Sequence, residues 1–276
     1  MENWQKEVKD KKRFEFGKNW LKYRSIINNE VINCSISSLK SFFEKETFKD
    51  LKFIDIGSGS GLFSLSAAKL GAFVHSIDFD LNSVHCTTLL KEKYGVWDEK
   101  WKVENGSILN TEFILTKGTF DLVYAWGVLH HTGNMNLALK NIMLLVRDKG
   151  LIGISIYNKQ YLISDLWLII KKLYCSSVVM KYIIIAMFIP FYFVIGAFFI
   201  DLLKFKNPFK RYTLKGKRGM SYYFDWFDWL GGLPYETATP KEIIELFANN
   251  GFILVKKNIV GNKLGCNEFV FQKQLS

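Results

Sequence analysis

Short apolar runs alternate with helical patterns between residues 51 and 157. The runs predict strands, and in the segments between them apolar residues recur at the three- and four-residue spacing of a helix. This alternation is typical of a parallel, doubly wound α/β sheet that helices cover on both faces. The expected strands are 52–56, 72–78, 101–104, 120–125 and 150–157, and the expected helices are 61–70, 81–94 and 136–146.

The same pattern resumes after an interruption. Residues 239–242 (Thr-Pro-Lys-Glu) have the form of a capping box with proline at the first helical position, which predicts a helix that ends near Asn250. Two final strands are expected near 252–259 and 267–273. Together with the five earlier strands, they predict one seven-stranded sheet.

Two segments lie outside the alternating pattern. Residues 1–50 are polar, with apolar positions at helical spacing, and predict an N-terminal helical segment. Residues 158–238 contain an apolar run, a basic stretch and an aromatic cluster, and predict a large helical insertion between the fifth strand and the last helix. The sheet domain is therefore expected to comprise residues 51–157 and 239–276.

The apolar run of the insertion, residues 182–200, contains no charged residue and reaches the length of a membrane-spanning helix. Topology argues against a single span, because the strands before and after the run belong to one sheet and must lie on one side of a membrane. Pro190 also divides the run into two short segments. Two interpretations remain: a bent helical pair that forms a hydrophobic lid over a binding site, or a pair that dips into one membrane leaflet.

The charge of the chain supports the interpretation that the helical pair contacts a membrane leaflet. The formal net charge is +11, which favours acidic partners such as anionic lipid, nucleic acid or a phosphorylated glycan. Basic residues flank the apolar run, and residues 178–218 are therefore expected to suit an anionic membrane surface. The flanking residues are Lys171, Lys172, Lys181, Lys204, Lys206, Lys210, Arg211, Lys215, Lys217 and Arg218.

The cysteines and the N-terminus indicate a reducing compartment. The four cysteines are far apart and match no metal-binding or redox spacing, so we expect buried free thiols. The first residues lack an apolar signal region. The expected location is the cytoplasm, with peripheral contact with the inner face of the membrane as an alternative. The cysteines are Cys34, Cys86, Cys175 and Cys266.

A glycine-spaced turn follows the first strand. Residues 55–61 read Asp-Ile-Gly-Ser-Gly-Ser-Gly, whereas the dinucleotide fingerprint needs a glycine at position 62, where Leu62 stands. Such a turn lets a cofactor lie against bare backbone. Asp55, which precedes the turn, suits a positively charged group better than a pyrophosphate.

This turn resembles motif I of the class I S-adenosyl-L-methionine (SAM) methyltransferases. Asp78 ends the second strand, where a carboxylate can accept hydrogen bonds from ribose hydroxyls, although a strand-end acid can also be only a turn residue. The resemblance implies a Rossmann-like methyltransferase sheet, SAM as cofactor, S-adenosyl-L-homocysteine (SAH) as product, and an N-terminal segment that closes over the cofactor or packs on the sheet. The implied cofactor-binding residues are Asn19, Trp20, Asp55, Gly57, Ser58, Gly59, Gly61, Leu62, Asp78, Phe79, Gly106, Ser107, Ile108 and Trp126.

The segment after the fourth strand, Leu129-His130-His131, resembles the ubiquinone-biosynthesis and small-molecule O-methyltransferase branches, methyltransferase types 11 and 12. It lacks the Asn/Asp-Pro-Pro-Tyr motif of many enzymes that methylate base amines. A hydroxyl acceptor needs a proton acceptor, for which neutral imidazole is suited. His130, and less so His131, is the candidate base. Residues 16–20, 76–80, 126–133, 156–158, 218–221, 228–236 and 265–269 further resemble a bacterial subgroup of unassigned substrate.

The leading hypothesis is a SAM-dependent methyltransferase that acts on a hydroxyl of an apolar, lipid-linked or glycan-precursor molecule. An RNA methyltransferase and a non-catalytic SAM-binding interaction protein are the alternatives, and nucleic acid is the less favoured partner because no RNA-binding module is evident. Aromatic residues at 222–229 wall an acceptor pocket or form the core of the insertion. Asp225 and Asp228 are too few for a metal site, and none is expected. The acceptor and the oligomeric state stay open.

Overall fold

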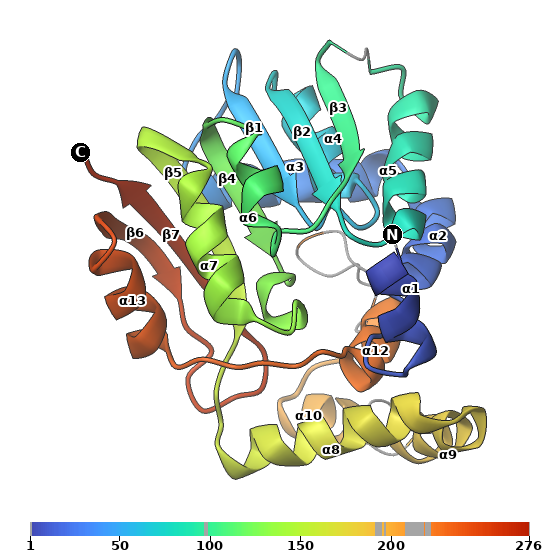
Figure 1. The fold of residues 1–276 in the computed structure, drawn as a ribbon. Coiled ribbons are helices and arrows are strands. Elements are labelled where there is room, and N and C mark those ends of the chain that lie inside the picture. The colour runs from blue at the N-terminus through green and yellow to red at the C-terminus, as the bar shows by residue number, and fades with distance from the viewer. Residues whose placement is uncertain are drawn as a thin grey trace.

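A seven-stranded sheet forms the centre of the molecule (Figure 1). The computed structural model describes residues 2–96, 99–190, 195, 197–207, 218 and 222–275. The strand order is β3-β2-β1-β4-β5-β7-β6; the pairs from β3 to β5 are parallel, and β7 is antiparallel to both neighbours. The strands are β1 (Lys52–Ile56), β2 (Phe73–Asp78), β3 (Trp101–Asn105), β4 (Phe120–Trp126), β5 (Val146–Tyr157), β6 (Phe252–Asn258) and β7 (Cys266–Lys273).

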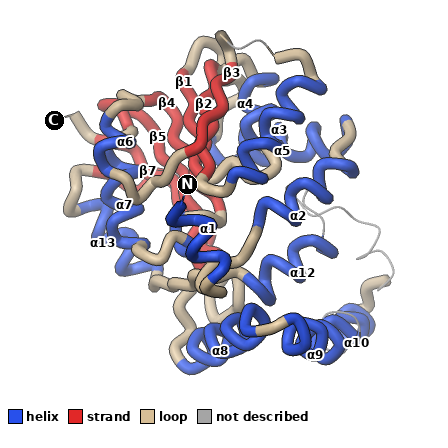
Figure 2. The backbone as a smooth tube through the Cα atoms, turned by 45° about the vertical axis from the view of Figure 1, so that its right-hand side comes forward, coloured by secondary structure: helices blue, strands red, loops and turns tan. Residues whose placement is uncertain are grey.

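Helices cover both faces of the sheet (Figure 2). One hydrophobic core lies under α3, α4 and α5, where Phe53 and Leu65 are fully buried, and the other lies under α6, α7 and α13, where Val123 and Phe247 are fully buried. This arrangement confirms the predicted doubly wound α/β fold. The helices are α3 (Asn29–Phe43), α4 (Leu62–Lys69), α5 (Leu81–Lys93), α6 (Thr111–Leu115), α7 (Met135–Leu144) and α13 (Pro240–Ala248).

The predicted elements agree with the structure to within about two residues, with two differences. Strand β5 begins at Val146 and not at 150, because the charged residues 147–149 hide its start from the apolar pattern. Helix α6 was not expected, since five residues are too few to show a period. It begins after Asn110, whose side-chain oxygen accepts a hydrogen bond from the Phe113 N–H at 3.0 Å.

The N-terminal segment links the sheet domain to the insertion. It contains α1 (Glu2–Lys9), α2 (Phe16–Tyr23), the short 3₁₀ turn η1 (Arg24–Ile26) and α3. The Gly17 N–H donates to Asp80 Oδ2 at 2.8 Å at the start of α5. The Asn19 Nδ2 donates to Asp228 Oδ1 at 2.8 Å in the insertion. Helix α2 is therefore held between α5 and the insertion.

The insertion forms a separate helical layer below the carboxyl ends of the strands (Figure 1). Helix α9 ends at Phe188, residues 189 and 190 continue in π-helical geometry, and residues 191–194 fall outside the described part of the chain, so the division of the run at Pro190 stays a prediction. Among the described residues, no helix has the length and hydrophobicity needed to cross a membrane. The helices of this layer are α8 (Leu162–Ser176), α9 (Val178–Phe188), α10 (Ala197–Leu203) and α12 (Tyr222–Gly231).

Two basic residues assigned to the membrane-facing flanks lie elsewhere. Lys171 is 1% exposed, and its Nζ donates to the backbone oxygen of Trp229. Arg218 lies in a cavity at the sheet. Aromatic rings in each place pack around the cation, which offsets part of its lost hydration. Lys210, Arg211, Lys215 and Lys217 fall outside the described residues.

The expectation of buried thiols holds for one cysteine. Cys86 on α5 is buried, and its Sγ is 3.3 Å from the Trp20 backbone oxygen. Cys34, Cys175 and Cys266 are partly exposed, so for these three the expectation was wrong. All four are free, and the described residues contain no cluster suited to a metal ion.

Candidate functional site

A cavity of about 890 Å³ lies at the carboxyl ends of the parallel strands. This edge is where doubly wound sheets bind ligands, because loops of opposite direction diverge there. Its walls come from the start of α2, the turns after β1, β2, β3 and β4, the end of β5, and the insertion. Of the residues expected to bind a cofactor, those that line the cavity are Trp20, Asp55, Gly57, Ser58, Gly59, Asp78, Phe79, Gly106, Ser107, Ile108 and Trp126.

Three of the expected residues do not line the cavity. Asn19 is engaged by Asp228, as described above. Gly61 precedes α4 with φ of 78°, and a Cβ there would lie 3.0 Å from the Thr87 backbone. Leu62 is fully buried in the core beneath α4. Gly61 and Leu62 therefore pack the turn against the core, and Asn19 links α2 to the insertion.

The glycine turn packs against the protein's own side chains. Gly57 and Gly59 have φ of 73° and 55°, which L side chains rarely adopt. A Cβ at Gly57 would lie 2.4 Å from Val128, and one at Gly59 would lie 2.9 Å from the Trp20 indole nitrogen. Val128 and Trp20 therefore occupy the space that a side chain at these positions would need, while Gly57 and Gly59 still line the cavity.

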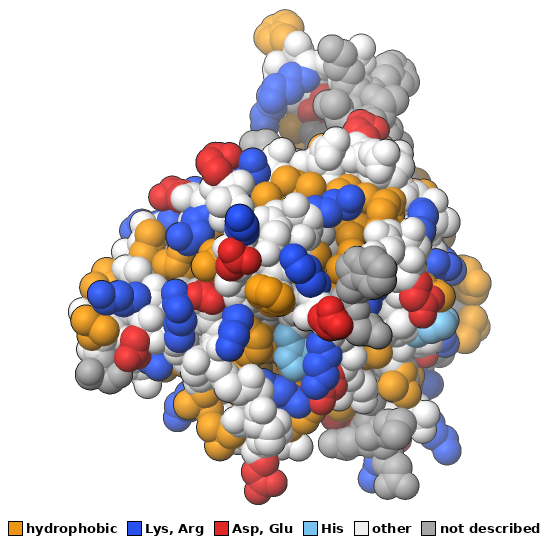
Figure 3. Space-filling view, turned by 90° about the horizontal axis from the view of Figure 1, so that it is seen from above, with side chains coloured by type: hydrophobic (Ala, Val, Ile, Leu, Met, Phe, Trp, Pro, Cys, Tyr) orange, Lys and Arg blue, Asp and Glu red, His pale blue; other side chains and the backbone are white. Residues whose placement is uncertain are grey.

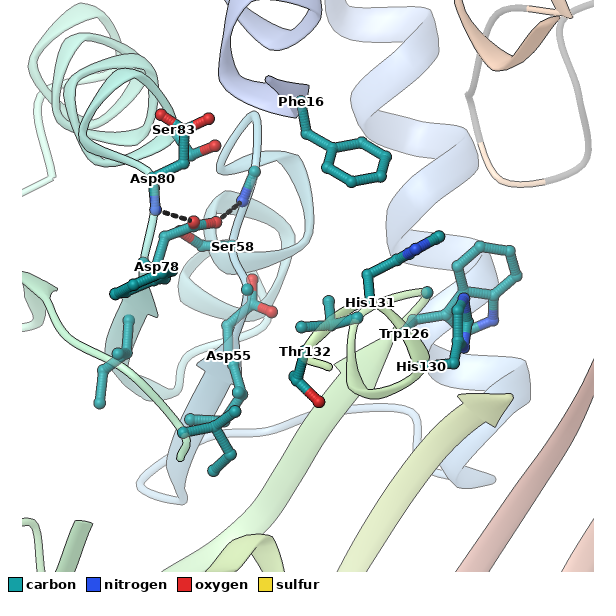
Figure 4. A pocket seen from close by; sticks show the side chains of 18 of the residues that line it. Phe16, Asp55, Ser58, Asp78, Asp80, Ser83, Trp126, His130, His131 and Thr132 are labelled. Carbon is teal, nitrogen blue, oxygen red and sulfur yellow. Dashed lines mark hydrogen bonds between the residues drawn. The ribbon is translucent and has the colours of Figure 1, made fainter. Parts of the chain in front are cut away.

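The Asp78 carboxylate is held in place at the end of β2. The Gly59 N–H donates to its Oδ2 and the Asp80 N–H donates to its Oδ1, both at 2.9 Å (Figure 4). Burial raises the pKa of Asp78 to about 7, although these two hydrogen bonds act in the opposite direction. Both oxygens keep a lone pair for a donor in the cavity.

Asp55 provides a second buried carboxylate beside the turn. The Ser64 hydroxyl donates to its Oδ2 at 2.6 Å. Burial raises the pKa of Asp55 to about 6, whereas the Ser64 hydrogen bond and the Arg218 guanidinium lower it. A cation placed next to Asp55 would stabilise its charged form.

The turn after β3 forms the wall at one end of the cavity. The Ser107 hydroxyl accepts a hydrogen bond from the Leu109 N–H at 3.2 Å, and Ile108 presents an apolar side chain. Asn110 caps α6, a role that asparagine and aspartate fill equally well. This end of the cavity therefore combines the apolar side chain of Ile108 with the polar groups of Ser107 and Asn110.

The two histidines after β4 differ in exposure. They lie in the 3₁₀ turn η2 (Leu129–His131), across the cavity from Asp78 (Figure 4). His131 Nδ1 lies 2.6 Å from the Pro234 carbonyl, which fixes its proton on Nδ1 and leaves Nε2 as an acceptor. His130 is 0% exposed and its Nε2 has no hydrogen-bond partner among the described residues, whereas His131 is 8% exposed.

Both histidines are neutral at physiological pH. Burial lowers the pKa of His131 to about 3 and lowers that of His130 well below its usual range. The charge of Lys171 adds to both shifts. A neutral imidazole can accept a hydrogen bond from a hydroxyl group.

Several wall residues were not assigned a role from the sequence. Arg13 donates from Nη1 and Nη2 to the His131 and Thr132 backbone oxygens at 2.9 and 3.1 Å, and from Nε to Glu7 at 2.6 Å. A single arginine in a polar segment gives no local signal of such a contact. Phe16, Tyr124, Tyr157 and Asp228 also line the cavity, as does Arg218, which the sequence pattern placed in a basic flank.

The aromatic cluster of the insertion contributes to both of its expected roles. Trp229 lines the cavity and also packs against the insertion core, which includes Trp167 and Leu230. Behind Trp229, Lys171 lies 5.0 to 5.8 Å from the ring centres of Tyr157, Trp229 and Tyr235. Burial lowers the pKa of Lys171 to about 7. The side chains of residues 222–225 fall outside the described part of the chain.

Known proteins share parts of this sequence and fold. Residues 54–152 match a family described as methyltransferase domain. A ubiquinone biosynthesis O-methyltransferase of Colwellia psychrerythraea is 32% identical over 115 residues, which cover 42% of this chain and 45% of that protein. An O-antigen chain terminator bifunctional methyltransferase/kinase of Escherichia coli is 32% identical over 83 residues, 30% of this chain and 11% of that protein. The chain thus spans less than half the length of these relatives.

The fold extends the likeness beyond the matched segment. The crystal structure of a magnesium protoporphyrin IX methyltransferase from Synechocystis, with bound SAH, has a TM-score of 0.51 at 12% identity and covers 89% of this chain and 83% of that chain. At that identity the likeness shows the fold alone. Sequence and fold agree: residues 54–152 are similar in sequence to a methyltransferase domain, and the sheet with its flanking helices is similar in fold to a SAM-dependent methyltransferase.

Proposed function

We propose that the protein transfers a methyl group from SAM to a hydroxyl of a small molecule that is apolar, lipid-linked or a glycan precursor. The observation that carries the proposal is the pair of buried carboxylates, Asp55 and Asp78, on either side of the glycine turn in one cavity. When bound, SAM supplies a methyl group on a positively charged sulfur, open to displacement by a nucleophile.

The cavity fits such a cofactor together with a small acceptor. Its volume of about 890 Å³ is at the upper end of the range of roughly 300–1,000 Å³ for small-molecule sites. Asp78 would accept hydrogen bonds from ribose hydroxyls, and Ile108 would pack against the base. Asp55 would face the amino group, whose charge offsets the cost of burying the carboxylate.

The residues around His131 would position the acceptor hydroxyl. Tyr157, Trp126 and Trp229 give this part of the cavity aromatic walls, which suit an apolar acceptor and exclude water. His131 Nε2 would hold the hydroxyl proton, since Nδ1 is committed to Pro234. Because His130 is fully buried, we place the proton acceptor at His131, although the sequence pattern favoured His130.

Isothermal titration with SAM and SAH tests the cofactor assignment. We expect both to bind, and Asp78→Ala to weaken SAH binding at least tenfold, whereas Asp10→Ala, an exposed site outside the cavity, leaves it unchanged. Folded protein that binds neither ligand contradicts the proposal. Labelled SAM incubated with lipid and polar extracts of the source cell then identifies the acceptor. Transfer only to RNA would support the RNA alternative, and binding without transfer would support the interaction protein.

A second proposal concerns the outer face of the insertion. Apolar side chains are exposed on α8, α9 and α10, among them Leu162 (83% exposed) and Phe205, just after α10 (100% exposed). Exposed lysines accompany them at 172, 181, 204 and 206. The face at the amino ends of the strands instead mixes charges of both signs with apolar side chains (Figure 3). We propose that this outer face rests on an anionic lipid leaflet, since apolar area with flanking lysines suits that surface.

Vesicle flotation tests the lipid contact. We expect the protein to float with vesicles that contain phosphatidylglycerol and to remain at the bottom with pure phosphatidylcholine. The variant Leu162→Gln/Leu203→Gln should lose flotation, because it removes exposed apolar area at the lipid face. Leu115→Gln, at a position on α6 that is 62% exposed, serves as the control. Equal flotation of both variants contradicts the lipid contact.

A further inference from the structure

Arg218 lies over two aromatic rings inside the cavity. Its Cζ lies 3.2 Å from the centre of the Trp126 ring and 4.5 Å from that of Phe63. Its Nη2 donates to the Tyr124 hydroxyl at 2.6 Å. Stacking on an aromatic face leaves the edge of a guanidinium, with its N–H donors, open to a ligand.

No carboxylate in the described part of the chain forms an ion pair with Arg218. Arg13, which also lines the cavity, differs in this respect: its three nitrogens are taken by Glu7 and two backbone oxygens. A guanidinium carries five N–H donors, and the described residues accept one hydrogen bond from Arg218. Its charge is therefore available to a ligand in the cavity.

The position of Arg218 separates it from the nucleoside end. Trp126, on which it stacks, ends β4, and the Trp126 indole donates to Glu268 on β7 at 2.7 Å. Asp78 and Ile108 lie at the ends of β2 and β3, on the other side of β1 in the sheet order. Arg218 also belongs to the insertion, which forms the aromatic wall around Tyr157 and Trp229. The guanidinium thus lies on the β4 side of the sheet, away from the nucleoside end, and near enough to Asp55 to lower the pKa of that carboxyl group, so the acceptor and the amino-acid end of the cofactor are both within its field.

We propose that Arg218 binds an anionic group, a carboxylate or a phosphate, of the methyl acceptor. The planar fork of a guanidinium matches the two oxygens of either group and binds them through charge-assisted hydrogen bonds. This inference rests on the proposed function, and it narrows the acceptor to an anionic hydroxyl compound. The carboxylate of the cofactor is the competing source of the same chemistry, and the experiment separates the two.

The test measures anion binding by calorimetry at constant ionic strength, with inorganic phosphate and benzoate as probes, on protein saturated with SAH and on free protein. We expect the wild type to bind at least one probe and R218Q to bind it about tenfold more weakly or not at all. R218K should retain part of the affinity, because lysine keeps the positive charge but lacks the planar pair of N–H donors. K204Q, an exposed site on the insertion, controls for the change in net charge and should match the wild type.

Two results overturn the inference. The first is a wild type that binds neither anion, or an R218Q variant that binds them as the wild type does. The second is an R218Q variant whose affinity for SAH falls about tenfold while its affinity for 5′-methylthioadenosine, which lacks the carboxylate, is unchanged; the guanidinium then serves the cofactor. Failure of the wild type to bind SAH contradicts the proposed function instead, and the titration of free protein still decides the role of Arg218.

Discussion

The Trp20 indole packs directly against Gly59 in the glycine turn. A Cβ at Gly59 would lie 2.9 Å from the Trp20 indole nitrogen, closer than real Cβ contacts. Trp20 comes from the N-terminal segment and Gly59 from the sheet domain, so this contact joins the two over the cavity. The glycine spacing of the turn therefore reflects the fit of the N-terminal helix as well as the binding of a ligand.

Replacement of Gly59 by alanine tests this contact. We expect Gly59→Ala to displace Trp20, to lower SAH affinity about tenfold and to destabilise the fold by about 1–2 kcal/mol, through backbone strain and overpacking. Gly95→Ala is the matched control, because Gly95 has a similar φ of 61° and nothing within 4 Å of an added Cβ. Calorimetry and urea unfolding measure both effects. If the two variants lose stability and SAH affinity equally, backbone strain alone explains the effect and the contact with Trp20 does not contribute.

Cofactor affinity should depend on the protonation of Asp78. Its pKa of about 7 in the free protein means that a proton must leave before ribose hydroxyls can donate to both oxygens. We expect SAH affinity to rise about tenfold between pH 6 and pH 8 and to level off above. Asp78→Asn should bind weakly at every pH and show no such rise. A wild-type affinity that is constant over this range contradicts the prediction.

The raised pKa of Asp78 also affects the stability of the fold. Stability should fall as pH rises, whereas cofactor affinity should increase. Because the pKa of Asp78 in the folded protein lies above the ordinary value of 3.8, the folded state holds more protons than the unfolded state between about pH 4 and pH 7. The free energy of unfolding should therefore decline as pH rises through this window. Urea unfolding at pH 5, 6 and 7.5 should show a shallower decline in Asp78→Asn than in the wild type. Parallel curves would show that Asp78 does not contribute.

His131 should not change its protonation state near neutral pH, so kcat should not depend on it there. Its pKa of about 3 keeps the imidazole neutral throughout the working range. With the acceptor identified and both substrates saturating, we expect kcat to be flat from pH 5.5 to pH 8, while the KM for SAM rises as pH falls. His131→Gln should lower kcat roughly 100-fold, the usual size of a general-base contribution. An acidic limb of kcat near pH 6.5 contradicts this account.

The buried Lys171 should make the fold more stable in alkaline solution. Its pKa of about 7 in the folded protein is below the ordinary 10.5, so the unfolded state binds more protons between those values. The free energy of unfolding should then rise from pH 7 to pH 10, and this rise should be absent in Lys171→Met. Lys171→Ala, which leaves a cavity among the rings, should cost about 2–4 kcal/mol. Urea unfolding at pH 6.5, 8 and 9.5 measures both variants.

Elements whose signals are local could be predicted well. The capping box at Thr239 is one example: its hydroxyl accepts from the Glu242 N–H at 3.2 Å, and the Glu242 side chain accepts from the Thr239 N–H at 2.7 Å. Both partners lie within one helical turn, so spacing alone indicates the contact. The acid at Asp78 could be found in the same way, because it ends a strand that is itself evident from its apolar residues.

Residues whose partners are distant in the chain could not be assigned. Arg13 contacts His131 and Thr132, Lys171 contacts Trp229, and Arg218 contacts Tyr124. The sequence placed Lys171 and Arg218 in a basic flank, because a cation beside an apolar run is more often exposed than buried. Whether a cation is buried depends on the rings and oxygen atoms that surround it after folding.

The sequence by itself determined the seven-stranded sheet, the glycine turn and the acids at the strand ends, since period, capping and spacing are properties of neighbouring residues. Only the tertiary structure decided which side chains wall the cavity, how deeply each histidine is buried in it, and which arginine has no carboxylate partner among the described residues. The physical reason is desolvation: the pKa values of Asp78 and His131 and the availability of Arg218 depend on groups that approach from other segments of the chain.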